Sequence, residues 1–340
     1  MGFIWLPRNT RYSKGGEVHM GLKKQRNESV LAAANQYFLD VGVNDEADRN
    51  VLSAYFLEID SLHARLTALA QVNIRPKDKD KILVQLTPET TLSPQATGSS
   101  PDYFRITTPM GLLHRMRDMT QALDLQHAPY AHTASWPLAC AMVASMAAFG
   151  HELNHAFSGH VALPSDAHQE SNSDFRAGGM VAAWLQRDDL RRKTLLDTTD
   201  QAHRPDLVIL ASVLLCLIFG PGTPGHVTPS NYPKPSDRFT LLMAGYVFLQ
   251  QNMHAAELPF TQAAVLRAPD WIPKAFAPLG LEAAARALLA KAETSASDPE
   301  SSVEPASTET RRRWYQSADL LRPIAKLLKA ALKRDAKRGL

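Results

Sequence analysis

The pattern of apolar and polar positions divides most of the chain into amphipathic helices. Over residues 27–72 apolar side chains recur three or four residues apart, as at Leu52 and Phe56, which is the spacing of one helix face. Asn44 or Asp45 can cap the second of two helices in this region. Further helices are predicted over 109–123, 135–157, 169–185, 206–219 and 238–254.

Two short segments have the pattern of strands instead. Residues 82–86 form an apolar run, and residues 103–107 combine aromatic and β-branched side chains. The segment between them, 87–101, is rich in Thr, Ser, Pro and Gly, which predicts a loop. The sequence therefore predicts a mainly α fold of the α+β class with one small sheet.

Composition sets limits on what kind of protein this is. The chain has 340 residues, of which 45% are hydrophobic and 21% are charged, so it can bury a large core and is not a disordered protein. Cys140 and Cys216 both lie in apolar stretches, so we expect buried free thiols. A disulfide scaffold and a cysteine-based zinc site are excluded.

The two ends of the chain differ in composition from the middle. Residues 1–26 are basic and aperiodic, which predicts an irregular arm, whereas 27–130 form a helical region with short strands. Residues 131–290 form the main helical core, and 291–310 are rich in Ser, Thr, Pro and Glu, which predicts a disordered linker. Residues 311–340 carry apolar residues on one face and predict a basic amphipathic helix.

Basic charge is concentrated in this last segment. It has ten Lys or Arg against two Asp, whereas the whole chain has 37 basic and 34 acidic residues. We therefore expect residues 311–340 to bind an acidic partner or an anionic surface, or to dock on the rest of the chain. Nucleic-acid binding is not expected of residues 1–310, which are mildly acidic.

The sequence also predicts a cytoplasmic protein without a transmembrane segment. The N-terminus has no apolar leader segment. The longest apolar run, 207–219, is shorter than the ~20 residues that cross a bilayer, so we expect a buried helix there.

The candidate chemistry lies in the pattern His-Glu-x-x-His at residues 151–155. Residues four positions apart share one face of a helix, so His151 and His155 can offer two imidazoles to one metal ion. Glu152 lies beside them and can take a proton from a water molecule that the metal activates. Ser135 is a candidate N-cap for this helix.

A catalytic zinc site needs a third protein ligand. Glu170 and Asp174 are four residues apart and share one face of the next predicted helix. Gly178 and Gly179 follow on that helix and allow another backbone, such as the helix of His151, to approach closely.

These two helices together resemble the gluzincin metallopeptidases, in particular the HtpX-like, ImmA/IrrE-like and phage-exclusion Lit-like peptidases. The resemblance covers residues 147–182 and implies a zincin-like helical core. It implies that His151, His155 and Glu170 bind one Zn²⁺ ion and that Glu152 is the general base. It also implies that Asp174 is a carboxylate that orients a ligand histidine.

The sequence departs from the family pattern in places. Asn154 stands where family members often have Gly, and the spacing from the second histidine to the third ligand is short. Asp166, His168 and Asp174 therefore stay open as alternative third ligands. A metzincin site is excluded because Val161 stands where that family has its third histidine.

A peptidase also needs hydrogen-bond donors for the developing oxyanion. The loop 221–238 resembles the His-Pro…Arg segment of HtpX-like and Lit-like peptidases, with Tyr232 where those have His. His226, Tyr232 and Arg238 are therefore candidate catalytic donors.

The predicted function is a zinc-dependent endopeptidase that hydrolyses peptide bonds of a specific intracellular protein target. The resemblance further implies a regulatory or phage-defence protease. The alternative is a non-catalytic, zinc-stabilised binding protein that acts through the basic C-terminal helix.

Overall fold

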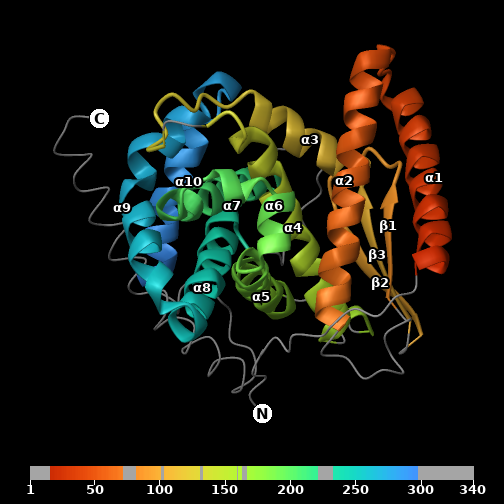
Figure 1. Cartoon of the computed structure of the whole chain (residues 1–340). Helices are drawn as coiled ribbons and strands as arrows, with labels where there is room; N and C mark the ends of the chain where they lie inside the picture. Colours follow the sequence, from red (N-terminus) through yellow and green to blue (C-terminus); the bar gives the residue numbers. More distant parts are fainter. Residues whose placement is uncertain are drawn as a thin grey trace.

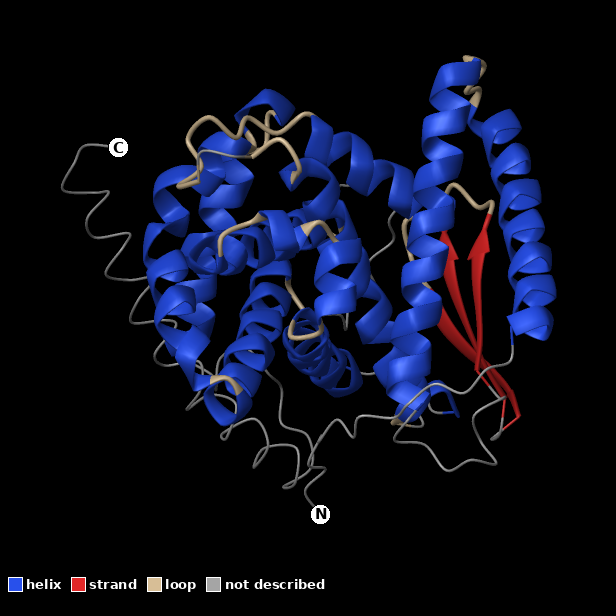
Figure 2. Ribbon diagram, viewed as in Figure 1, coloured by secondary structure: helices blue, strands red, loops and turns tan. Residues whose placement is uncertain are grey.

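The structure is a computed structural model of the whole chain, drawn in Figure 1. It describes residues 16–71, 82–100, 103–130, 133–158, 160–162, 167–220 and 233–297. Figure 2 shows that helices dominate these residues and that the strands form one small sheet. The predicted mainly α fold with a small sheet is therefore confirmed.

The N-terminal part is a hairpin of two long helices, α1 (Gly16–Val41) and α2 (Glu46–Gln71). The Asp45 side chain accepts a hydrogen bond from the backbone N–H of Asp48 at 2.9 Å, so Asp45 rather than Asn44 caps α2.

The prediction of an irregular arm over 1–26 is wrong for residues 16–26, which belong to α1. The Arg26 guanidinium donates to the carboxylate of Asp60 on α2, with Nη2–Oδ1 at 2.8 Å. The contact with Asp60 stabilises a helical conformation that the spacing of apolar residues over 16–26 does not predict. The remaining residues of the predicted arm lie outside the described part of the chain.

The sheet contains β1 (Ile82–Thr87), β2 (Gln95–Ser100) and β3 (Tyr103–Pro109) in the order β1-β3-β2. β1 runs parallel to β3, and β2 runs antiparallel to it, with Ala96 opposite Ile106. Both predicted strands are confirmed, but the loop predicted over 87–101 is wrong where it contains β2. Pairing with β3 imposes an extended conformation on a segment whose Gly and Ser residues resemble those of a loop.

The remaining helices form the body at the left of Figure 1. The five that the sequence predicted there are all present, but α6, α9 and α10 were not predicted. α9 has Pro269 and Pro273 inside it, which conceals its helical pattern. α10 ends at Ser297, so the linker predicted from residue 291 is wrong over 291–297. The bounds are α3 (Met110–Gln121), α4 (Trp136–Phe157), α5 (Ala167–Leu185), α6 (Asp188–Lys193), α7 (Arg204–Ile218), α8 (Pro235–Met253), α9 (Leu258–Ala275) and α10 (Glu282–Ser297).

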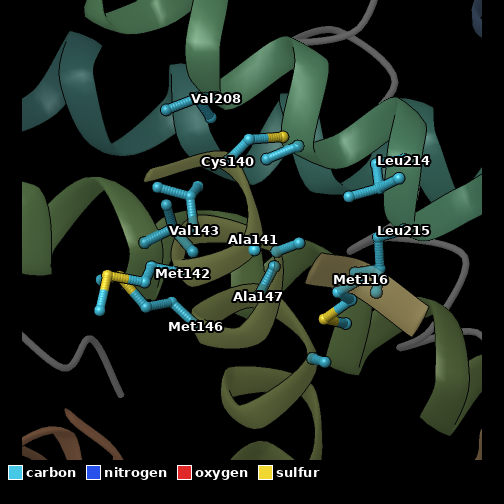
Figure 3. Packing of buried hydrophobic residues seen from close by; sticks show 14 of the residues in the cluster. Met116, Cys140, Ala141, Met142, Val143, Met146, Ala147, Val208, Leu214 and Leu215 are labelled. Atoms are coloured by element: carbon cyan, nitrogen blue, oxygen red, sulfur yellow. The ribbon is translucent and has the colours of Figure 1, made fainter. Parts of the chain in front are cut away.

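Helix α4 is the centre of the fold and is buried along most of its length. Figure 3 shows Cys140 and Val143 of this helix in one apolar cluster with Met116 of α3 and with Val208, Leu214 and Leu215 of α7. Buried apolar residues form a single cluster that extends from α1 to α10, so the predicted regions 27–130 and 131–290 share one core. Both cysteines are free and buried, as expected.

The apolar run 207–219 forms most of α7 and is buried, as predicted. Within the described residues, the stretch Gln201–Ile218 is long and apolar enough to span a membrane, but 72% of it is buried inside the fold. This is weak support for a span, because the core helix of a globular protein meets the same criteria.

The glycines of α5 contact α8. The expectation that Gly178 and Gly179 let the helix of His151 approach is therefore wrong. A Cβ atom on Gly178 would lie 1.8 Å from the carbonyl oxygen of Leu242, and one on Gly245 would lie 1.8 Å from that of Phe175. The two backbones therefore touch at these positions, and only glycine fits there. α4 approaches α5 through Gly150, whose added Cβ would lie 3.4 Å from the Cα of Ala177.

Candidate metal centre

The last turns of α4 and the first turns of α5 bring the candidate metal ligands together. α4 begins with Ser135 at its N-cap position, where the side chain makes no capping hydrogen bond, and with Pro137 in the first turn. The run of small and apolar residues that follows carries the helix through the core to His151 and His155. The close contact between α4 and α5 at Gly150 then places Glu170 opposite the two histidines.

Three ligand atoms converge at this contact. The Nε2 atoms of His151 and His155 are 3.0 Å apart. The Glu170 carboxylate lies 3.0 Å from the first of these nitrogens and 3.4 Å from the second. Two zinc ligands at bond lengths of about 2.0–2.1 Å in a tetrahedron are about 3.3 Å apart, so this spacing suits a small divalent cation.

The hydrogen bond at Nδ1 of His151 determines the tautomer of this ring. Its Nδ1–H donates to Asp174 Oδ1 at 2.8 Å, so the neutral imidazole has its lone pair on Nε2. That lone pair points at the Nε2 atom of His155 and at the carboxylate of Glu170. When both rings present a lone pair on Nε2, three acceptors face one another here, and a cation between them would satisfy all three.

Asp174 is held in turn by Arg238 at the start of α8. The guanidinium donates to both carboxylate oxygens, with Nε–Oδ2 at 2.9 Å and Nη2–Oδ1 at 3.0 Å. Burial opposes the charge of Asp174, but Arg238 and His151 outweigh it and lower the pKa of this carboxyl. Asp174 therefore stays ionised with 1% of its surface exposed, and its bond to Nδ1 holds the His151 ring in one orientation.

The electrostatics of the site favour positive charge at its centre. Burial by itself would lower the pKa of His151, but the charges and hydrogen bonds of Asp174 and Glu170 raise it to about 10. The pKa of Glu170 is lowered: burial opposes its ionisation, and hydrogen bonds from the two histidines outweigh that effect. Without a metal ion, a proton on His151 supplies the charge.

Glu152 lies on the neighbouring side of α4, with 8% of its surface exposed. Burial is the main cause that raises its pKa, and the two histidines partly oppose this. Its carboxylate also accepts a hydrogen bond from the backbone N–H of Ala96 on β2. The candidate base is thus placed between the histidines and the edge strand of the sheet.

Two contacts at this site were not anticipated from the sequence. The Asn154 amide donates to Ser173 Oγ at 3.0 Å and so links α4 to α5. His160, in the short 3-10 turn His160–Ala162 after α4, places its Nδ1 3.2 Å from Nδ1 of His155. Four of the chain's twelve histidines lie within residues 151–168, but their spacing did not indicate this contact.

The predicted oxyanion donors are not assembled in the described part of the chain. The candidate donors His226 and Tyr232 lie outside the described residues. The same is true of Asp166 and of the side chain of His168, which were alternative third ligands. Arg238, the third candidate donor, has a buried guanidinium that is bonded to Asp174. The sequence missed this because the partners are far apart along the chain.

Comparisons of the chain with protein-family models, with curated proteins and with solved structures find no match.

Proposed function

We propose that this protein is a zinc-dependent endopeptidase in which His151, His155 and Glu170 hold one Zn²⁺ ion and Glu152 is the general base. The observation that carries the proposal is the convergence of three ligand atoms within 4.8 Å of one another, with Glu152 on the same helix beside them.

The donor set favours a hydrolytic zinc site over a structural one. Two imidazoles and one carboxylate are the ligands of several zinc hydrolases, which leave the fourth position for water or substrate. Structural zinc sites usually have four protein ligands. Among the residues that the structure describes, the group has three members.

Zinc at this position would polarise a peptide carbonyl and make a water molecule more acidic. Glu152 can accept the proton of that water on its carboxylate, because burial raises its pKa and makes it a stronger base. The same carboxyl group can then donate the proton to the leaving amine. Asp174 and Arg238 keep the His151 ring in the orientation that this chemistry needs.

The location of β2 supports an extended polypeptide as the substrate. It is an edge strand, and the carboxylate of Glu152 contacts its backbone at Ala96. An extended peptide that pairs with such an edge gains main-chain hydrogen bonds irrespective of its side chains. Paired there, its backbone would run past Glu152.

The proposal includes a cytoplasmic setting and one or a few protein targets. A regulatory or phage-defence role rests on the resemblance to ImmA/IrrE-like and Lit-like peptidases. Residues 311–340 would then determine where the protease acts, through an acidic partner or an anionic surface.

The test is the substitution Glu152→Gln, which preserves the size of the side chain and removes the base. We expect one zinc per chain in both proteins by elemental analysis. New protein N-termini should be found by proteomics in cells that express the wild type and not in those with Glu152→Gln. Glu46→Gln, at the exposed start of α2, is the matched control and should cleave like the wild type.

Cleavage that persists in Glu152→Gln would refute the mechanism. Zinc in both proteins with no new termini in either would support the alternative, a zinc-stabilised binding protein that acts through residues 311–340.

A further inference from the structure

The turn that follows α4 brings a third histidine against the candidate metal ligands. We propose that His160 is a positioning residue that fixes the tautomer and the ring orientation of the ligand His155. This inference rests on the proposed metal site and extends it to the outer side of the second histidine.

The contact is made by the short turn that follows α4. α4 ends at Phe157 and Ser158 is its C-cap, and the following 3-10 turn begins at His160. The ring of His160 then lies across that of His155, with centroids 5.2 Å apart and planes at 71°. Edge-to-face packing at this distance restricts rotation of the His155 ring about its Cβ–Cγ bond.

The positions of the protons follow from the two contacts of His155. Its Nε2 faces His151 Nε2 and Glu170, where a ligand must present a lone pair. The proton of the neutral ring is therefore on Nδ1, which lies 3.2 Å from Nδ1 of His160. His160 accepts this hydrogen bond and has its own proton on Nε2.

The two ligand histidines are thus supported by different chemistry. His151 donates to an aspartate that is itself paired with Arg238, whereas His155 donates to a neutral imidazole. A neutral acceptor orients the ring and adds less negative charge to the ligand than a carboxylate does. Ser158 donates to the side chain of Asn154 at 3.2 Å and stabilises the last turn from which His160 departs.

The turn also touches the sheet. Residues of the 3-10 turn contact β2, the strand whose backbone bonds to Glu152. The turn that carries His160 therefore contacts both the candidate ligand His155 and the edge strand proposed to bind substrate.

The test is the affinity for zinc, measured by competition with a chromogenic chelator on the full-length protein. His160→Ala removes the acceptor, and His160→Phe keeps an aromatic ring without it. We expect both to weaken zinc binding by roughly 10- to 100-fold, as loss of an outer hydrogen-bond partner does in other zinc sites. His160→Asn places an amide oxygen near the position of Nδ1 and should restore affinity close to that of the wild type. His127→Ala, at an exposed histidine between α3 and α4, is the control and should not change it.

The visible absorption of the cobalt-substituted protein gives a second readout. His160→Ala and His160→Phe should change the band positions, whereas the His160→Asn spectrum should resemble the wild type. Wild-type affinity in both the Ala and Phe variants would overturn this inference alone. Loss of one imidazole from the metal shell of His160→Ala, measured by X-ray absorption, would make His160 a ligand and also overturn it. No metal binding by the wild type would overturn the metal site and this inference together.

Discussion

His151 is the residue on which the whole candidate site depends, because both of its nitrogens are engaged. One faces the metal position with Glu170, and the other donates to Asp174, which is bonded to Arg238. The candidate ligands are contributed by α4 and α5, whereas the supporting arginine comes from α8. A substitution of Asp174 or Arg238 should therefore change the orientation of the His151 ring as well as the local packing.

Asp174→Asn tests this dependence directly. An amide can present its NH₂ group to His151 and leaves the buried Arg238 without its counter-ion. We expect zinc affinity to fall by roughly 10- to 100-fold and the free energy of unfolding to fall by about 3–5 kcal/mol. Chelator competition and urea denaturation measure the two effects. Asp40→Asn, on the exposed side of α1, is the control, and an equal effect there would contradict the argument.

Zinc binding should strengthen as the pH rises. In the metal-free protein the pKa of His151 is raised to about 10, so this ring carries a proton between pH 6 and 8. Zinc requires the neutral ring and must displace the proton, so the apparent affinity should increase about tenfold per pH unit in this range. Calorimetry in buffers of different ionisation enthalpy would report the released proton. A flat profile with no proton release would show that His151 is already neutral in the metal-free protein and would contradict the raised pKa.

At the scale of elements, the site depends on how closely three helices approach one another. α4 meets α5 at Gly150, and α5 meets α8 at Gly178 and Gly245. These contacts determine how far Glu170 lies from the histidines and how far Asp174 lies from Arg238. Asn154 and Ser173 add a polar link between α4 and α5 at the level of the ligands.

Gly178→Ala should therefore impair both stability and metal binding. The new methyl group would lie 1.8 Å from a backbone oxygen of α8, so the helices must separate. We expect a loss of roughly 1–3 kcal/mol in the free energy of unfolding, as for other overpacked positions, together with weaker zinc binding.

Gly179→Ala is the matched control for this experiment. Its nearest contact would be a backbone oxygen of Gly245 at 3.5 Å, which is an ordinary distance. Thermal unfolding and zinc titration of the two variants should separate clearly. Equal behaviour would mean that the α5–α8 contact does not position the ligands.

At the scale of the whole molecule, the described core is complete before the basic segment begins. Buried apolar residues extend from Val30 to Ala292, and α10 ends at Ser297. The ten Lys or Arg residues of 311–340 follow this core in the sequence and lie outside the described residues, and their proposed role is to bind a partner or a surface.

A chain that ends at residue 310 should keep its fold and its zinc. We expect the melting temperature and the zinc content to match those of the full chain, because neither the core nor the ligands are removed. Binding to anionic vesicles or to an acidic partner should be lost in the same protein. A large fall in melting temperature would show instead that 311–340 docks on the rest of the chain.

The sequence by itself determined the class of fold and the centre of the site. Helical spacing of apolar residues marks the long helices, and the spacing of His151, Glu152 and His155 places all three on the end of one helix. Local patterns suffice for these features because neighbours three or four residues apart meet within one helix. The sequence did not predict the strand β2 or the helix α9, because strand pairing and helix packing override their unfavourable composition.

Only the tertiary structure decided how the ligands are supported. Arg238 is 64 positions from Asp174, and the base Glu152 meets the backbone of Ala96 on a strand that the sequence did not reveal. Such contacts depend on how whole helices and strands pack, which periodicity within one element does not encode. The physical reason is that hydrogen bonds and ion pairs act over a few ångströms in space, whatever the separation of their partners along the chain.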